Sequence, residues 1–166
     1  MTRKVTKERL EQFMREWGAA ARSPDKAHFT EGAAALLLGF REQSVDVDVR
    51  LAPEPKGAFE AIAVLKDKLD LNVELASPDD FIPPSANWRE RSRPIATHGL
   101  VEFLHFDFAL QALAKLERGH RRDVEDVAGF LRGGFVTAAE RATGLPKSSR
   151  SWCGIQRSSR NSSSDV

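Results

Sequence analysis

Apolar residues recur in the first part of the chain with a helical period and then in an unbroken run. Residues 6–21 predict one helix, because four apolar side chains fall at i, i+3, i+4 and i+7: Leu10, Phe13, Met14 and Trp17. After a turn signal at residues 23–25, residues 27–30 are expected to form a short strand. The run AAALLLGF after Gly32 is apolar on every side and predicts a short buried helix.

Strict alternation of apolar and polar side chains predicts two further strands, at residues 45–51 and 72–77. In the first, one face consists of Asp46, Asp48 and Arg50 and the other of Val45, Val47, Val49 and Leu51. In the second, Glu74 lies opposite Val73 and Leu75. Each strand therefore has one face suited to a core and one face that carries carboxylates.

A helix, a basic loop and a hairpin are predicted for the middle of the chain. Apolar residues at helical spacing indicate a helix from residue 58 to the break at Asp70. Residues 78–93 contain prolines and a basic cluster, and we expect a mobile flap that carries Trp88, Arg89, Arg91 and Arg93. Residues 95–98 and 100–106 are expected to form a hairpin around the glycine between them.

Two helices are predicted after the hairpin. Asp107 is placed to cap the first of them, which Gly119 ends. The second covers residues 121–131, with three side chains expected to face inward: Val124, Val127 and Leu131. A glycine pair ends this helix, and a short helix over residues 137–141 is expected to follow.

Length and composition indicate one globular domain with a short appendage. The chain has 166 residues, of which 41% are hydrophobic and 30% charged, and its net charge is +1, so any basic surface must be local. The last 19 residues contain eight serines, and we expect a domain over residues 1–146 and a disordered tail over 147–166. A single cysteine, Cys153, and no signal-peptide or membrane-spanning pattern predict a cytoplasmic protein without a membrane partner.

The charged face of residues 45–51 holds the strongest candidate chemistry. Asp46 and Asp48 are two residues apart on a strand, so their Cα atoms lie about 6.5 to 7 Å apart and both side chains can reach one hard cation. Glu74 joins them if both strands belong to one sheet. Carboxylates combined with substrate phosphates suit Mg²⁺ or Mn²⁺, and three carboxylates can hold two ions. The alternative is that a half-buried strand simply needs a polar face.

The segment that leads into these aspartates, FTEGAAALLLGFREQSVDVD, resembles a nucleotidyltransferase signature. In that signature a glycine and a small residue precede paired aspartates by roughly a dozen residues, and here 12 residues separate Gly32-Ala33 from Asp46. This residue pattern is similar to that of the bacterial group that includes the AbiEii and MenT-type toxins and the DUF6036 family. This resemblance implies an α/β fold with a small mixed sheet of the polymerase-beta-like type, helices on one face and a helical C-terminal part. It also implies that Gly32, Ala33 and Ser44 contact the nucleotide.

A second block, ALAKLERGHRRDVEDV at residues 112–127, resembles a helical block of the same group. The resemblance implies that Lys115 contacts the triphosphate and that Arg122, Asp123 and Asp126 position it. A lysine is a compact charge suited to phosphate, and the two aspartates share one helical face. The alternative is a solvated Lys115 beside a surface pair between Arg122 and Asp126.

The turn before Gly32 departs from the pattern of the group. Related proteins often carry two glycines, or glycine and serine, followed by a hydroxyl side chain, whereas this chain reads Glu31-Gly32-Ala33-Ala34. A phosphate-binding hydroxyl is therefore missing, and a carboxylate lies near the expected phosphates. This departure favours a protein that has lost activity.

Two functions follow as expectations. The first is a metal-dependent nucleotidyltransferase that moves a nucleoside monophosphate from NTP to a hydroxyl of an RNA or protein acceptor. Such proteins occur in toxin–antitoxin and defence modules, which implies a possible partner protein encoded nearby. The second is a degenerate relative that regulates a neighbour through protein contacts. Fold alone does not decide between them, because activity depends on the site.

Overall fold

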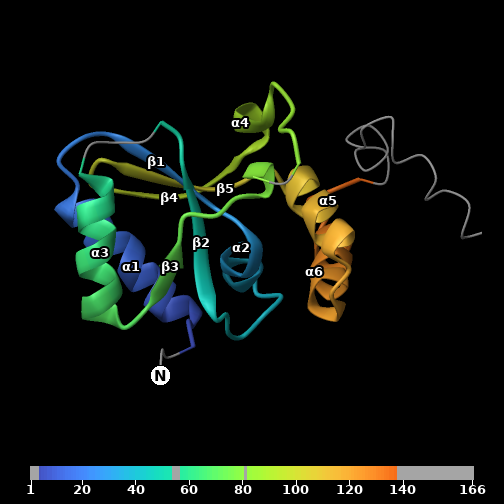
Figure 1. The fold of residues 1–166 in the computed structure, drawn as a ribbon, viewed down its shortest axis with the longest axis horizontal. Coiled ribbons are helices and arrows are strands. Elements are labelled where there is room, and N and C mark those ends of the chain that lie inside the picture. Colours follow the sequence, from blue (N-terminus) through green and yellow to red (C-terminus); the bar gives the residue numbers. More distant parts are fainter. Residues whose placement is uncertain (1–3, 54–56, 81, 138–166) are drawn as a thin grey trace, which may run out of the picture.

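The computed structural model describes residues 4–53, 57–80 and 82–137 (Figure 1). Its elements are α1 (Lys7–Ala20), β1 (Asp25–Phe29), α2 (Glu31–Leu37), β2 (Asp46–Leu51), α3 (Ala58–Leu69), β3 (Asn72–Glu74), a 3-10 turn η1 (Pro78–Asp80), α4 (Trp88–Arg91), β4 (Arg93–His98), β5 (Val101–His105), α5 (Phe108–Arg118) and α6 (Arg121–Arg132). The expected short helix at residues 137–141 falls, apart from residue 137, outside the described residues, as does the serine-rich tail.

The strands form one mixed sheet with the order β3-β2-β1-β5-β4. β1 is central: it pairs with β2 in antiparallel orientation and with β5 in parallel orientation. β3 extends the sheet parallel to β2, and β4 extends the other side antiparallel to β5, as the hairpin prediction requires. The predicted α/β class with a small mixed sheet is therefore confirmed.

One face of the sheet packs against α1, α2 and α3 to form the main core. The stripe of α1 is buried as predicted, and Trp17 is 1% exposed. It meets apolar side chains from the strands and the other two helices, among them Phe103, Val47, Leu36 and Ile62. α1 and α3 lie side by side under the sheet, on the left of Figure 1. Since these helices share one core cluster, the prediction of helices on one face holds for this part of the chain.

α5 and α6 form a helical pair beside the sheet, on the right of Figure 1. The Asp107 side chain accepts a hydrogen bond of 2.9 Å from the Ala109 N–H and so caps α5, as predicted. Gly119 ends the helix with φ 68°, a conformation that favours glycine. The two helices pack through a core of their own, which includes Phe108, Ala112, Val127 and Phe130.

The expected mobile flap differs from the structure, because part of it is docked. Trp88 is only 3% exposed, and its ring lies 5.1 Å from that of His28 on the sheet face opposite the main core. Arg91 forms an ion pair with Asp107 at the start of α5, and Arg89 stacks over the Trp88 ring. Trp88 is large enough to bury much apolar surface here, so it anchors the segment.

Three apolar side chains expected to face the core are exposed instead. Val45 precedes β2 and is 57% exposed, and Leu75 follows β3 and is 50% exposed, because the strands are shorter than the alternation predicts. Val124 is 50% exposed because α6 turns Asp123 and Asp126 inward. In the part of the chain that the structure describes, no helix has the length and apolar character needed to cross a membrane.

Candidate functional site

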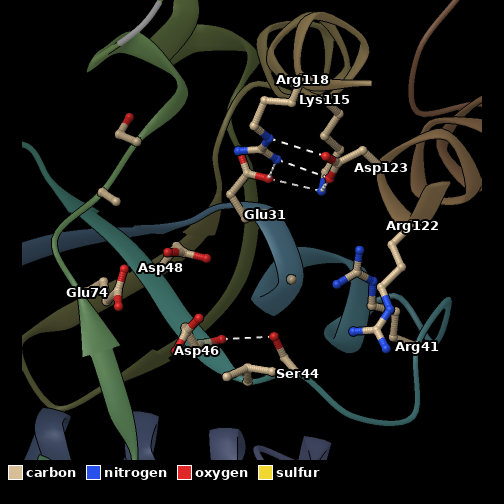
Figure 2. Close-up of a pocket in the computed structure, with 14 residues that line it drawn as sticks. Glu31, Arg41, Ser44, Asp46, Asp48, Glu74, Lys115, Arg118, Arg122 and Asp123 are labelled. Atoms are coloured by element: carbon tan, nitrogen blue, oxygen red, sulfur yellow. Dashed lines mark hydrogen bonds and ion pairs between the residues drawn. The ribbon is translucent and has the colours of Figure 1, made fainter. Parts of the chain in front are cut away.

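The β2–β3 pair brings the three predicted carboxylates to one face of the sheet. Asp48 is in register with Glu74, and Val47 with Val73. Both valines are buried in the main core, so the acidic side chains point to the opposite face. Figure 2 shows Asp46, Asp48 and Glu74 along this face. The predicted common face is confirmed, although β3 ends at Glu74 and does not extend to residue 77.

Asn72 links two of these carboxylates, and the sequence prediction missed it. Its Nδ2 donates to Asp46 Oδ1 at 2.6 Å and to Glu74 Oε1 at 3.0 Å. A signal was available, because Asn72 lies two residues before Glu74 on the same strand and therefore on the same face. The amide holds Asp46 and Glu74 beside each other.

Asp48 lies in an environment that disfavours its charged form. Burial raises the pKa of Asp48 to about 7, and the negative charges of Glu31, Asp46 and Glu74 act in the same direction. Lys115 opposes this shift. A divalent cation relieves repulsion of this kind, so the donor set fits a hard, oxygen-binding metal ion.

The carboxylates do not yet form a closed metal cage in this conformation. Among residues 4–53, 57–80 and 82–137, no three Asp, Glu, His or Cys side chains converge closely enough to hold an ion together. Magnesium typically takes only one or two carboxylates and completes its shell with water and substrate phosphates. Asp46 and Asp48 meet that smaller requirement, and Asn72 keeps Glu74 beside Asp46.

Lys115 lies across from these carboxylates and is almost fully buried, at 1% exposure. Its Nζ contacts Glu31 Oε2 at 3.0 Å, Asp126 Oδ2 at 2.8 Å and Asp123 Oδ1 at 3.4 Å. The interpretation of Lys115 as a solvated helix residue is therefore wrong. The two α6 aspartates surround it, as the resemblance implied.

Two arginines that the sequence prediction missed complete this cationic cluster. Arg41 makes a two-pronged contact with Asp126, with N–O distances of 2.8 and 2.5 Å. Arg118 contacts Glu31 and Asp123. Arg118 lies one α-helical turn after Lys115, at a spacing that aligns side chains, which was a usable signal; nothing in the sequence pairs residue 41 with residue 126.

Arg122 lines the pocket but does not take part in this network. The described residues offer it no ion pair, and Asp126 is bound by Arg41 and Lys115 instead. Both the expected surface pair between Arg122 and Asp126 and the expected positioning of Lys115 by Arg122 are therefore absent. Of the three residues expected to position Lys115, only Asp123 and Asp126 contact it.

The turn from β1 into α2 places its residues in different environments. Gly32 lies so close to Ser44 that a Cβ at residue 32 would come within 2.3 Å of the serine Oγ. Ser44 Oγ donates to the Asp46 carbonyl oxygen at 3.0 Å and thereby steadies the start of β2. Ala33 is fully buried in the main core, so its side chain does not reach the pocket.

These groups line one open pocket with a volume of about 370 Å³. Carboxylates from β2 and β3 form one wall, and the cations of α5, α6 and the α2–β2 connection form the other (Figure 2). Of the predicted site residues, the pocket brings together Gly32, Ser44, Asp46, Asp48, Glu74, Lys115, Arg122 and Asp123. Asp126 lies behind Lys115, and Ala33 lies in the core.

Comparison with known proteins adds no assignment to this geometry. The chain matches no protein-family model, no curated protein and no solved structure. The function must therefore be argued from the pocket itself.

Proposed function

We propose that this chain is a nucleotidyltransferase that uses a divalent metal ion to move a nucleoside monophosphate from NTP to a hydroxyl group of an RNA or protein acceptor. The sheet would then be of the polymerase-beta-like type. The resemblance at residues 30–48 and 112–127 suggests this class, and toxin–antitoxin or defence modules are its expected setting.

One observation carries the proposal: a face of paired carboxylates looks across an open pocket at a cluster of buried and half-buried cations. Transfer of a phosphoryl-type group needs both, because the substrate brings several negative charges and a metal ion. If β2 merely needed a polar face, there would be no reason for a buried Lys115 across the pocket, or for an Asp48 that is itself partly buried among other carboxylates.

Asp46 and Asp48 are the residues that would hold Mg²⁺ or Mn²⁺, with Glu74 as a third ligand once it leaves Asn72. The metal ion, when bound, neutralises phosphate charge and lowers the pKa of an attacking hydroxyl. Arg118 and Arg122 would bind the phosphate tail from the opposite wall. Lys115, held by Asp123 and Asp126, would add positive charge at the floor of the pocket.

A second candidate function is a regulatory binding protein that has lost catalysis. The observation that favours it is the Glu31 carboxylate, which contacts both Lys115 and Arg118 and so occupies the cations that a triphosphate would need. In this alternative the chain would act through protein contacts.

The decisive experiment is incubation of the full chain with each labelled NTP and Mg²⁺, with and without tRNA. Product that carries label on tRNA or on protein supports the nucleotidyltransferase. Absence of transfer, together with absence of metal-dependent NTP binding, leaves the regulatory protein.

We predict that Asp46→Asn or Asp48→Asn abolishes Mg²⁺-dependent NTP binding while the fold persists. Both side chains are on the face opposite the main core, so the packing of Val47 and Val49 is untouched. Removal of one charge also relieves repulsion in the metal-free protein. Calorimetric titration of Mg-NTP and a thermal melt test this for each variant.

Asp67→Asn on α3 is the matched control, because it removes the same charge at an exposed position that does not line the pocket. It should bind Mg-NTP as the wild type does. Aspartate variants of β2 that bind as well as this control contradict the metal site.

A further inference from the structure

Glu31 adopts a backbone conformation that is unusual for its residue type. Its φ is 55°, in the left-handed region that favours glycine. The Glu31 N–H donates to Gln111 Oε1 at 3.0 Å, and Gln111 is fully buried and donates in turn to the Phe106 carbonyl oxygen. A strained residue persists only where its surroundings hold it, and such residues cluster at ligand sites.

This backbone aims the Glu31 side chain at the cationic wall of the pocket. Its Oε2 contacts Lys115 Nζ at 3.0 Å and Arg118 Nη2 at 2.5 Å. Figure 2 shows the three side chains pointing toward one another at the top of the pocket. One carboxylate oxygen thus serves two cations, as an oxygen of a bound phosphate does.

The charges of this cluster balance only when Glu31 is counted. Lys115, Arg118 and Arg41 supply three positive charges, and three carboxylates pair with them: Glu31, Asp123 and Asp126. Without Glu31 the cluster has a net charge of +1, and Arg122 on the same pocket raises this to +2. The pocket therefore contains a cationic subsite that its own residue neutralises.

Glu31 is also the carboxylate that can leave most easily. Asp123 and Asp126 belong to α6 and are 8% and 3% exposed, whereas the Glu31 side chain comes from the start of α2 and is 14% exposed. An incoming anion must overcome the two ion pairs that hold the Glu31 carboxylate, one with Lys115 and one with Arg118.

We propose that Glu31 is a displaceable internal anion that closes the Lys115–Arg118 subsite until a polyphosphate replaces it. The identity of this anion as the phosphate tail of an NTP rests on the proposed function; the competition itself does not. Displacement adds the same cost for every ligand of the subsite, so it lowers all their affinities by one common factor. At a given ligand concentration, anions that bind the two cations weakly then leave the subsite empty, whereas ligands of high negative charge still fill it.

The test is calorimetric titration of inorganic tripolyphosphate and pyrophosphate into the full chain in EDTA, so that no metal ion takes part. Glu31→Gln keeps the size of the side chain and removes its charge, and it should bind both anions at least tenfold more tightly than the wild type. Glu31→Gly should show the same gain, and glycine also suits the positive φ, which keeps the test valid if the glutamine variant folds poorly.

Two controls locate the effect. Glu60→Gln removes one negative charge from an exposed position on α3 and should leave both affinities unchanged. Arg118→Gln added to Glu31→Gln should remove the gain in affinity, because the double variant lacks the arginine that the loss of the Glu31 charge makes available to the anion. Equal affinities for wild type and both Glu31 variants, or an equal gain in Glu60→Gln, would overturn the proposal.

Failure here is distinguishable from failure of the proposed function. A gain in metal-free polyphosphate binding without any Mg²⁺-dependent NTP binding sustains the internal anion and removes the nucleotidyltransferase. Mg-NTP binding that depends on Asp46, together with metal-free polyphosphate affinities that do not change in the Glu31 variants, sustains the nucleotidyltransferase and removes the internal anion.

Discussion

At the scale of single residues, Lys115 combines a structural and a functional role. Its ammonium group is the shared partner of carboxylates from α2 and α6, and it is almost completely removed from water. Loss of one member of a buried charge cluster leaves the others uncompensated, which costs far more than an exposed ion pair contributes. Replacement of Lys115 therefore cannot isolate its effect on nucleotide binding.

We predict that Lys115→Met lowers the free energy of unfolding by about 3 to 5 kcal/mol, because methionine has a similar length and leaves three carboxylates with only Arg41 and Arg118 to balance them. Arg121→Ala is the matched control. It breaks an exposed pair with Glu125 and should cost at most about 1 kcal/mol. Urea unfolding of both variants measures the difference, and a Lys115→Met loss no larger than the control would contradict the buried network.

The candidate site could be predicted from the sequence only where neighbours along the chain also share a face. Asp46 and Asp48 were found by alternation, and Asp123 and Asp126 by the resemblance of residues 112–127, with helical spacing placing both on one face. Arg41 and the orientation of Glu31 were not, because each depends on a partner more than 80 positions away. Such contacts exist only after α6 and α5 have packed beside the sheet.

At the scale of elements, the contact between α1 and the β4–β5 turn explains why the first helix contains a glycine near its end. A Cβ on Gly18 would come within 2.3 Å of the His98 carbonyl oxygen, and one on Gly99 within 2.2 Å of the Gly18 carbonyl oxygen. The two backbones therefore touch directly. Gly99 also has φ 56°, which favours glycine at the turn.

We predict that Gly18→Ala destabilises the protein by about 1 to 3 kcal/mol, because the added methyl group meets backbone atoms that cannot move aside cheaply. The sign is informative, since the same change in an open helix position stabilises by up to about 1 kcal/mol. Thermal and urea unfolding measure it. Arg15→Ala on the exposed side of α1 should be nearly neutral, and a stabilised Gly18→Ala would contradict the close approach.

The sequence patterns predicted the positions of helices and strands better than they predicted which face of each is buried. The periods of α1 and β2 predicted both their positions and their buried sides, because those sides are wholly apolar. In α6 the inward side holds Asp123 and Asp126 with Val127 and Phe130. The rule that apolar residues face inward therefore gave a wrong prediction for Val124, which is exposed. Because charged residues are buried in α6, its apolar residues alone did not predict which face is buried.

At the scale of the whole molecule, buried titratable groups of opposite sign set how stability depends on pH. Burial lowers the pKa of His28 and of His105 to about 4, so the folded state binds fewer protons than the unfolded state between about pH 4 and 6.5. Burial raises the pKa of Asp25 to about 6, which has the opposite effect. Acidification from pH 7 therefore weakens the fold through the histidines and strengthens it through Asp25.

We predict that Asp25→Asn stabilises the protein at pH 7.5 by about 1 to 3 kcal/mol more than at pH 4. Above pH 6 the wild type bears the cost of a buried, charged carboxylate; as the pH falls through 6 toward 4 the proton returns and that cost disappears. Unfolding free energies of both proteins across this range measure the effect. A difference that does not change with pH would contradict a raised pKa in the folded state.

The central position of β1 also has a consequence for synthesis on the ribosome. Each β1 residue pairs with a β5 residue 76 positions further along, as in Asp25 with Val101. At translation rates of roughly 5 to 20 residues per second, one edge of β1 waits about 4 to 15 seconds for its partner. During that interval the nascent chain presents an open strand edge, a template for wrong pairing or aggregation. A chaperone that shields residues 25–29 until the hairpin emerges should thus raise the yield of folded protein.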